Sequence, residues 1–538
     1  MELIDQHTKK IMEGCKERAR SAGLRFETET LEYIVTNRDL LELSPKSMIP
    51  NLYDYWVHEV EVLKEKGRYE LYPTNPYETV INTRPVISFY NDNNPDWLNV
   101  MIFYHVLAHI DFFQNNRFFE HTWDQDFNGE ALADKRFIAR LRSAYGRWVD
   151  YVIEFSRGID NLVDYFRELN CLSRQSKSVQ EQKIDYYFDV FVQDELSWKQ
   201  SEYIKEIERY NQHVHKHGDL GTEAFLTDVN KQYPEFADKF RVWREKAGSR
   251  VSKDLIQFIA DHSEFVNRHE NRWMRSILEI VRKTSLFFQP QIRTKIMNEG
   301  WATFWHERLF LQDERIGGHE VDFSKAHSQV ASLSRVGLNP YALGVRLFQE
   351  IEEWADKGRY TYEFEKILST RSRKAFNRKG QSGIDYAFAV RENLSDSMFI
   401  RTFITQDFVD RHRLFVAGKR LNKAKRSWEY TVISRKAEDY KAMLLKNLYH
   451  PPRISYSVGD TGVLQLSHEF EGRPLVTDYI ANTMLGIEYL WGHPVTLDTH
   501  EVRKVQKPPQ AGGEPEVTWD QVRYTMHSKQ LTRETMSS

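Results

Sequence analysis

Apolar residues recur at helical spacing along the chain as far as about residue 410. The longest of these segments are 137–170, 184–210 and 250–287. Clusters of proline, asparagine and aspartate interrupt the pattern between residues 72 and 97, and Pro290 is expected to end the third helix. Residues 1–404 are therefore predicted to form a mainly helical domain.

Beyond about residue 411 the pattern changes to short alternating segments mixed with helical ones. The predicted strands are 427–435, 453–458, 462–470 and 494–502, and the predicted helices are 436–450 and 475–492. The order strand, helix, strand, strand, helix, strand is that of a ferredoxin-like module, so residues 405–506 are predicted to form a ferredoxin-like α+β domain. Residues 507–538 are expected to be a proline- and glycine-rich linker followed by a flexible tail.

Composition narrows the classes of function that this chain can have. Its 538 residues are 41% hydrophobic and carry a net charge of −3, without the basic excess typical of nucleic-acid-binding proteins. No apolar run approaches the roughly 20 residues that span a bilayer, and the N-terminus lacks the apolar core of a secretory signal. A cytoplasmic protein is therefore expected. With Cys15 and Cys171 as its two cysteines, any metal would be held by nitrogen and oxygen atoms.

The first candidate site lies in the string FYHVLAHIDFFQNN at residues 103–116, where His105 and His109 are four residues apart. Two such side chains lie on one face of a helix, one turn apart, as they do in zinc peptidases with an H-E-x-x-H motif. Val106 stands where that motif has its glutamate. The pair is therefore either part of a metal site or two packed core histidines.

The second candidate string is NEGWATFWHE at residues 298–307. Glu299 and His306 are seven residues apart, nearly two helical turns, so both project from one face of a helix with small residues between them. If this face meets the dihistidine face, His105, His109, Glu299 and His306 converge on one divalent metal. Zinc fits such a set of histidines and a carboxylate best, and iron or manganese with open positions is the alternative.

A family resemblance adds to this prediction. The strings HVLAHIDFFQNN, TKIMNEGWATFWH and GLNPYALG, in this order, closely resemble the stage V sporulation protein R family, as do YDYWVHEVEVLKEKGRYELYPTNPYE and LWGHPVTLDT. Ala108 departs from the glycine expected there. The resemblance implies a cytoplasmic bacterial protein that is linked, in spore-forming bacteria, to making the peptidoglycan of the spore cortex. It also implies two partners, an AAA-type serine protein kinase and a protein with a von Willebrand A-like domain.

The same residues resemble a zincin-like peptidase, which implies a zincin-like fold for the helical N-terminal region. In that resemblance His105 and His109 are metal ligands and Glu299 is the third. Because Val106 cannot accept a proton, another side chain would have to act as the base. The candidates for this role are Glu307, Glu130, Asp111 and His306. His327 is expected to be an ordinary histidine or a group that supports a ligand.

Two functions stay open at this point. The first is metal-dependent hydrolysis of a peptide or amide bond in cell-wall metabolism, with the metal as Lewis acid. The second is a non-catalytic regulator or scaffold, in which the cluster holds two helices together while the surface recruits the kinase complex. A di-iron or manganese oxidase would need more inward-facing carboxylates than these strings provide.

Overall fold

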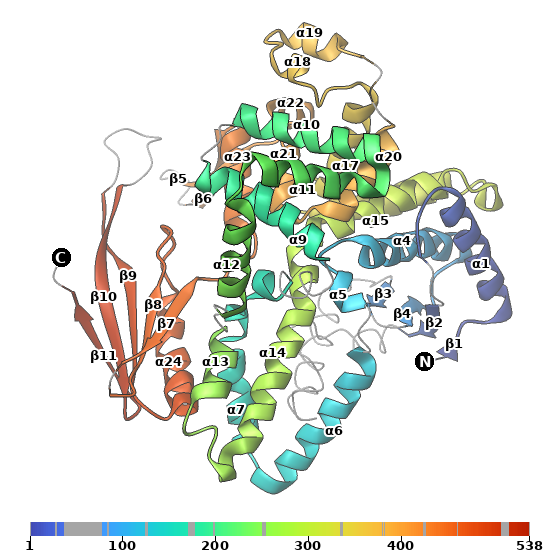
Figure 1. Cartoon of the computed structure of the whole chain (residues 1–538). Helices are drawn as coiled ribbons and strands as arrows, with labels where there is room; N and C mark the ends of the chain where they lie inside the picture. Colours follow the sequence, from blue (N-terminus) through green and yellow to red (C-terminus); the bar gives the residue numbers. More distant parts are fainter. Residues whose placement is uncertain are drawn as a thin grey trace. The chain divides into compact units, whose positions relative to one another are not determined.

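The structure is a computed structural model, in which helices predominate (Figure 1). It describes residues 2–26, 30–36, 78–82, 85–123, 127–169, 178–196, 200–249, 254–333, 337–378, 380, 382–422, 427–459, 461–506 and 516–536. The chain divides into two compact units, Met1–Leu162 together with Ile259–Ser538, and Val163–Phe258. This division falls inside the predicted helical domain of residues 1–404, where helical periodicity gives no sign of it. The boundary expected at residue 405 stays a prediction.

A small sheet and a helix lie at the N-terminal end of the larger unit (Figure 1). The elements are β1 (Glu2–Leu3), α1 (Gln6–Ser21), β2 (Thr30–Val35), β3 (Glu78–Ile81) and β4 (Val86–Asn91). The strand order is β1-β2-β4-β3, and β2 and β4 run parallel while the other pairs are antiparallel. Helix α1 packs against the next helix, α4, so the sheet region is joined to the helical core.

The core of the larger unit is formed by helices that are far apart in the sequence. They are α4 (Asp96–Asn115), α15 (Lys295–Phe310), α17 (Pro340–Asp356) and α20 (Gly383–Asn393). Residues 98–113 of α4 are all buried, because their sequence is almost continuously apolar. Helices α15 and α17 approach closely at two glycines: a Cβ atom on Gly300 would lie 2.4 Å from the Cα atom of Gly344. This contact is possible only because neither residue has a side chain.

Other helices of this unit are α6 (Phe127–Tyr145), α7 (Trp148–Arg157), α14 (Arg272–Arg293), α16 (Glu320–Val330), α21 (Asp396–Phe403) and α22 (Gln406–Arg411). The prediction that Pro290 ends a helix is wrong, since α14 continues to Arg293. Because the proline lies in the last turn, its missing N–H removes only the hydrogen bond to the carbonyl of Leu286. Helix α15 starts two residues after α14 ends.

Five strands form the C-terminal sheet, in the order β11-β10-β9-β8-β7. The elements are β7 (Ile454–Val458), β8 (Leu464–His468), α24 (Thr477–Trp491), β9 (Val495–Gln506), β10 (Glu516–His527) and β11 (Gln530–Thr535). Strands β8 and β9 are parallel and connected by α24, and the remaining neighbours are antiparallel. The strands and helix predicted between residues 453 and 502 are therefore present.

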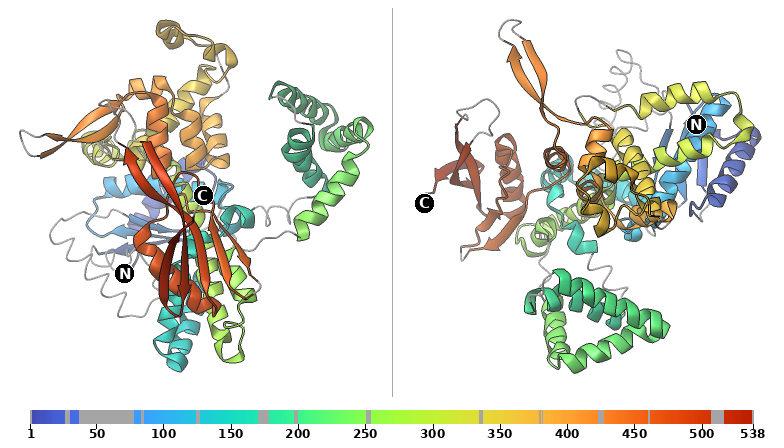
Figure 2. Two further views of the ribbon diagram at one scale, coloured as in Figure 1. Left: turned by 90° about the vertical axis from the view of Figure 1, so that its left-hand side faces the viewer. Right: turned by 90° about the horizontal axis from the view of Figure 1, so that it is seen from above.

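The ferredoxin-like arrangement is not what the structure shows. The first predicted strand is β6 (Ser427–Ser434), which pairs with β5 (Val416–Asn422) in a separate two-stranded sheet. This hairpin stands out from the rest of its unit in both views of Figure 2. Its short connection makes β5 the nearest available partner, and helix α23 (Ala437–Asn447) follows it as predicted. The sheet is completed instead by strands that follow β9.

The prediction of a flexible tail also differs from the structure. Residues 516–527 and 530–535 form β10 and β11. Val522, Tyr524 and Met526 alternate along β10 and are buried, so this strand contributes a regular apolar face. The predicted linker at 507–515 lies outside the described residues.

The smaller unit, Val163–Phe258, is helical and has an aromatic core of its own. It contains α9 (Val179–Tyr186), a π-helical segment at Tyr187–Glu195, α10 (Gln200–His217), α11 (Gly221–Gln232) and α12 (Phe236–Ser249). Tyr187, Phe191, Phe225 and Phe236 pack edge to face in its centre. This independent core explains why the segment forms a compact unit.

Candidate metal centre

Helices α4 and α15 hold the candidate ligands, and both are fixed by buried contacts. The carboxylate of Asp396, at the start of α21, accepts hydrogen bonds from the backbone N–H groups of Ile296 and Met297, both at 2.9 Å. These bonds satisfy donors at the beginning of α15 that have no partner within the helix. Helix α4 packs directly against α15. The sequence therefore positions two buried, rigid helices side by side.

The structure brings together three of the four predicted ligands. The Nε2 atoms of His105 and His109 are 3.1 Å apart, and the Oε2 atom of Glu299 lies 3.6 Å from Nε2 of His109. One ligand atom from each of these residues lies within 4.8 Å of the others. Both histidines are 5% exposed, so the cluster is almost closed to solvent.

Asn298 fixes the orientation of His109. Its Oδ1 atom lies 2.8 Å from Nδ1 of His109. Because an amide oxygen can only accept a hydrogen bond, Nδ1 of His109 carries the hydrogen and Nε2 keeps its lone pair. That lone pair is the one directed toward His105 and Glu299. Asn298 was not among the residues selected from the sequence, although it directly precedes Glu299 in the NEGWA string.

His306 supports His105 and lies behind it. The Nδ1 atoms of the two rings are 2.9 Å apart, and Nε2 of His306 is 3.0 Å from Nδ1 of His327, on α16. Both nitrogens of His306 therefore face other imidazoles. The structure places His306 where side chains that hydrogen-bond to metal ligands usually lie. His327 in turn contacts His306.

Burial keeps these imidazoles neutral. It lowers the pKa of His105 and of His306 well below the ordinary value, and the neighbouring imidazoles lower both values further. Burial also lowers the pKa of His327, against the opposing effect of the Glu307 carboxylate. A neutral imidazole is the form that binds metal, so His105 does not have to lose a proton before it can act as a ligand.

Two of the predicted catalytic carboxylates lie away from the three ligand atoms. Glu307 accepts a hydrogen bond from Nε2 of Gln349 at 3.1 Å, and its other oxygen is 4.0 Å from Nε2 of His327. Glu130, on α6, is exposed and pairs with Nζ of Lys283 at 3.0 Å. Glu307 therefore contacts a glutamine and lies near a histidine, and Glu130 belongs to an ordinary ion pair.

Asp111 is buried on the other side of α4 and is fully occupied by hydrogen bonds. Its carboxylate accepts from Nε1 of Trp301 at 2.8 Å and from the backbone N–H of Arg25 at 2.7 Å. Nε of Arg391 lies 3.1 Å from it. Burial raises its pKa to about 6, and Arg391 opposes this shift. Asp111 therefore joins α4, α15 and α20, and its place in the fold is structural.

A cavity of about 420 Å³ reaches His105 and His306. Its other walls include Met101, Ile102, Leu338 and Tyr341, which are apolar or aromatic. The ring of Tyr341 lies parallel to that of His105, with 6.1 Å between their centroids. This space gives a small molecule a route to the histidine cluster, which would otherwise be enclosed.

A mainly helical chain, with two histidines and a glutamate brought together by two buried helices, defines a protein with a candidate metal centre. The chain belongs to the SpoVR-like family, since the family model described as "SpoVR like protein" matches residues 3–449. That range contains His105, His109 and Glu299. Among the helices that the structure describes, none is long and apolar enough to cross a membrane.

The chain is also similar in sequence to a bacterial protein. The chain is 25% identical over 338 residues to a protein of Escherichia coli (strain K12) named "Uncharacterized protein YcgB". The match covers 59% of this chain and 58% of the length of that relative. No solved structure matches the chain.

Proposed function

We propose that this protein is a metal-dependent hydrolase of peptide or amide bonds, with zinc held by His105, His109 and Glu299. The observation that carries the proposal is the 3.1 Å distance between the two Nε2 atoms. Two ligands bound 2.0–2.1 Å from a tetrahedral zinc ion lie about 3.3 Å apart, so the helices already present the spacing that zinc needs. Zinc would supply Lewis-acid polarisation of a substrate carbonyl.

The protein's own residues hold and orient the site. Asn298 keeps the lone pair of His109 on Nε2, and the 2.9 Å contact between Nδ1 of His105 and Nδ1 of His306 holds the ring of His105 in place. The uncharged walls of the adjoining cavity admit an uncharged part of a substrate. Tyr341 lies where its ring flanks His105 and faces a molecule in that cavity.

The link to the spore cortex that the family resemblance implies supports a cell-wall peptide or amide as the substrate class. Peptidoglycan contains short peptides joined by amide bonds, which is the chemistry that such a centre can hydrolyse. The uncharged walls of the cavity favour the amide backbone of such a peptide over its charged ends.

A second candidate function is favoured by one observation. Val106 is fully buried at the position where zinc peptidases have their base, and no other His, Cys, Asp or Glu of the described residues joins the three-residue cluster. A metal without a neighbouring base would act as a clamp between α4 and α15. The protein would then be a regulator or scaffold that acts with the serine protein kinase and the von Willebrand A-like partner implied by the family.

Metal content and hydrolysis together distinguish these functions. Purified protein should contain about one zinc ion per chain, and His109→Ala should lose it, while His121→Ala, a histidine outside the cluster, should keep it. Purified peptidoglycan peptides are then incubated with each protein and followed by mass spectrometry. Hydrolysis by the wild type and by His121→Ala, but not by His109→Ala, supports the hydrolase. Metal binding without cleavage supports the scaffold, and wild-type protein without stoichiometric metal contradicts both.

A further inference from the structure

A second cavity, of about 660 Å³, lies in the C-terminal part of the larger unit. Its floor is formed by side chains of β8, β9 and α24 that are between 1% and 6% exposed. These are Leu466, Leu497, Ile480, Met484 and Ile487. The turn between α7 and residue 162 forms another wall. None of the lining residues is shared with the cavity beside His105.

The apolar floor follows from the sequence of the two elements. Leu464, Leu466 and His468 alternate on the buried face of β8, and Ile480, Met484 and Ile487 share one face of α24. Both faces point to the same space. They leave a volume within the range of pockets that hold small organic ligands, which are mostly apolar with a few polar groups.

The apolar surface continues to the mouth of the cavity. Val476 and Tyr479, at the start of α24, line it and are 60% and 69% exposed. Large exposed apolar side chains that adjoin a deep apolar pocket extend its area of contact with a ligand. A molecule with a long apolar body would therefore contact both the floor of the cavity and the apolar side chains at its mouth.

Three arginines and three carboxylates line the cavity, and they differ in how far they are already paired. Glu471 is already held by His450 at 2.9 Å and by Arg453 at 3.4 Å, so its two oxygens are engaged. Arg473 makes one described hydrogen bond, of 3.5 Å, to the carbonyl of Leu445. Its guanidinium keeps most of its donors for a ligand, and guanidinium groups bind carboxylates with two parallel hydrogen bonds.

The inner wall holds two further ionisable groups, Asp160 and Arg157, which influence each other electrostatically. Burial raises the pKa of Asp160 to about 6, and Arg157 opposes this shift. Burial lowers the pKa of Arg157, and Asp160 opposes that. His468 also lines the cavity and uses Nδ1 for a 2.9 Å contact with Oγ1 of Thr499. The hydrogen bond from His450 lowers the pKa of Glu471 and Arg473 adds to this shift, so Glu471 is the carboxylate that competes with a ligand for Arg473.

We propose that this cavity binds a small amphiphilic carboxylate, with its apolar body on the floor between β8 and α24 and its carboxylate at Arg473. The apolar floor supplies affinity by burying hydrocarbon, and the guanidinium selects an acid over an alcohol or an amine. The site lies outside the candidate metal centre and does not depend on its activity.

Fluorescence of 1-anilinonaphthalene-8-sulfonate with the full-length protein tests this site. The probe is itself an apolar anion. Decanoate should displace it at a lower concentration than decanol or decyltrimethylammonium does. Thr483→Trp places a ring in the cavity from a half-buried position of its wall and should abolish displacement by decanoate. Arg473→Gln should weaken the binding of decanoate about tenfold, the value of one charge-assisted contact. The binding of decanol should be unchanged.

Arg503→Gln is the matched control, since Arg503 is an exposed arginine of β9 paired with Asp520 at 3.6 Å. It should bind decanoate as the wild type does. Thermal unfolding of each variant confirms that it is folded. If folded Thr483→Trp binds decanoate normally, the ligand does not occupy this cavity. If decanol or the amine binds as tightly as decanoate, or Arg473→Gln has no effect, the assignment of a carboxylate is overturned.

Discussion

The Oδ1 atom of Asn298 lies 2.8 Å from Nδ1 of His109, and this contact determines which ring nitrogen of His109 is free to bind a metal. We expect Asn298→Ala to weaken zinc binding about 10- to 100-fold, the usual cost of removing a group that orients a metal ligand. Asn298→Asp keeps an oxygen acceptor and should retain most of the affinity. Competition with a zinc-binding dye measures both, and equal affinities for wild type and Asn298→Ala would contradict the role of this contact.

The two glutamates of the NEGWATFWHE string should behave differently. Glu299→Gln removes the charged ligand oxygen, which lies 3.6 Å from His109, and should reduce zinc content to a small fraction of the wild-type value. Glu307→Gln changes a side chain that contacts Gln349 and should leave zinc content unchanged. Elemental analysis of both variants checks this. Equal loss in both would mean that Glu307 contributes to the site through the histidines.

The contact between Gly300 and Gly344 should be sensitive to a single methyl group. A Cβ atom on Gly300 would lie 2.4 Å from the Cα atom of Gly344, so Gly300→Ala has to push α15 and α17 apart. We expect a loss of about 1–3 kcal/mol in the free energy of unfolding, as for other overpacked cores. Gly317→Ala is the control, because its Cβ would meet only a carbonyl at 3.6 Å. Denaturant unfolding that gives equal stabilities would show that the helices can separate without cost.

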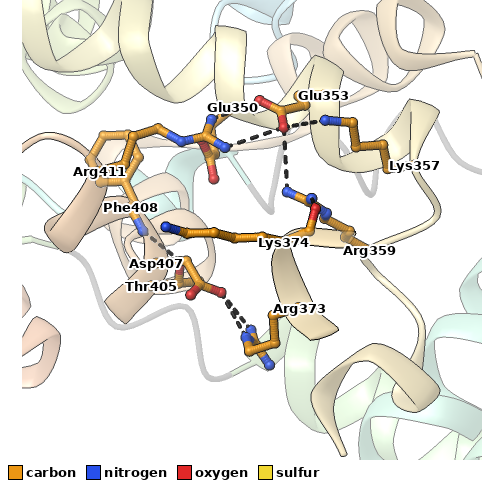
Figure 3. A network of polar contacts seen from close by, with 10 residues as sticks. All are labelled: Glu350, Glu353, Lys357, Arg359, Arg373, Lys374, Thr405, Asp407, Phe408 and Arg411. Atoms are coloured by element: carbon orange, nitrogen blue, oxygen red, sulfur yellow. Dashed lines mark hydrogen bonds and ion pairs between the residues drawn. The ribbon is translucent and has the colours of Figure 1, made fainter. Parts of the chain in front are cut away.

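An ion-pair network on α17 predicts a pH dependence (Figure 3). Arg411 and Lys357 donate hydrogen bonds to Glu353, and although burial opposes the shift, they lower the pKa of this carboxyl to about 2. Because the folded pKa is below the unfolded value, Glu353 stabilises the fold above the unfolded pKa, and this contribution is lost as the pH falls toward 2.

The stability difference between the wild type and Glu353→Gln should therefore narrow when the pH is lowered from 6 to 3. Chemical unfolding at each pH measures it. Glu264→Gln, at a glutamate whose side chain is 82% exposed, should show no such change. A constant difference for Glu353→Gln across this range would mean that the pKa of Glu353 is not lowered in the folded protein.

The sequence predicts the two helices of the candidate site because their patterns are local. His105 and His109 are one turn apart in an apolar helix, and Glu299 has small neighbours, so the faces can be identified before their partner is known. Asn298 and the position of His306 behind His105 depend on how α4 and α15 are rotated about their axes. Spacing within one helix carries no information on that rotation.

The fold beyond single elements was predicted less well, for a related reason. Alternation identified β7, β8 and β9, but it does not specify which strands pair, so β6 was assigned to a sheet it does not join. In β10 the outward residues are polar and a proline- and glycine-rich segment precedes it, which hid the alternation of Val522, Tyr524 and Met526. Helical periodicity likewise gives no indication that Val163–Phe258 packs around its own aromatic core.

The pairing of β10 with β9 also depends on the order in which the two strands are synthesised. Strand β9 is complete at residue 506, but β10, its partner on one side, spans residues 516–527. At about 5–20 residues per second, the ribosome needs roughly 1–4 s to add this partner. Until β10 pairs with it, β9 has an open edge that can pair with another chain. The C-terminal sheet is therefore closed on this side of β9 only after the residues of β10 have been made.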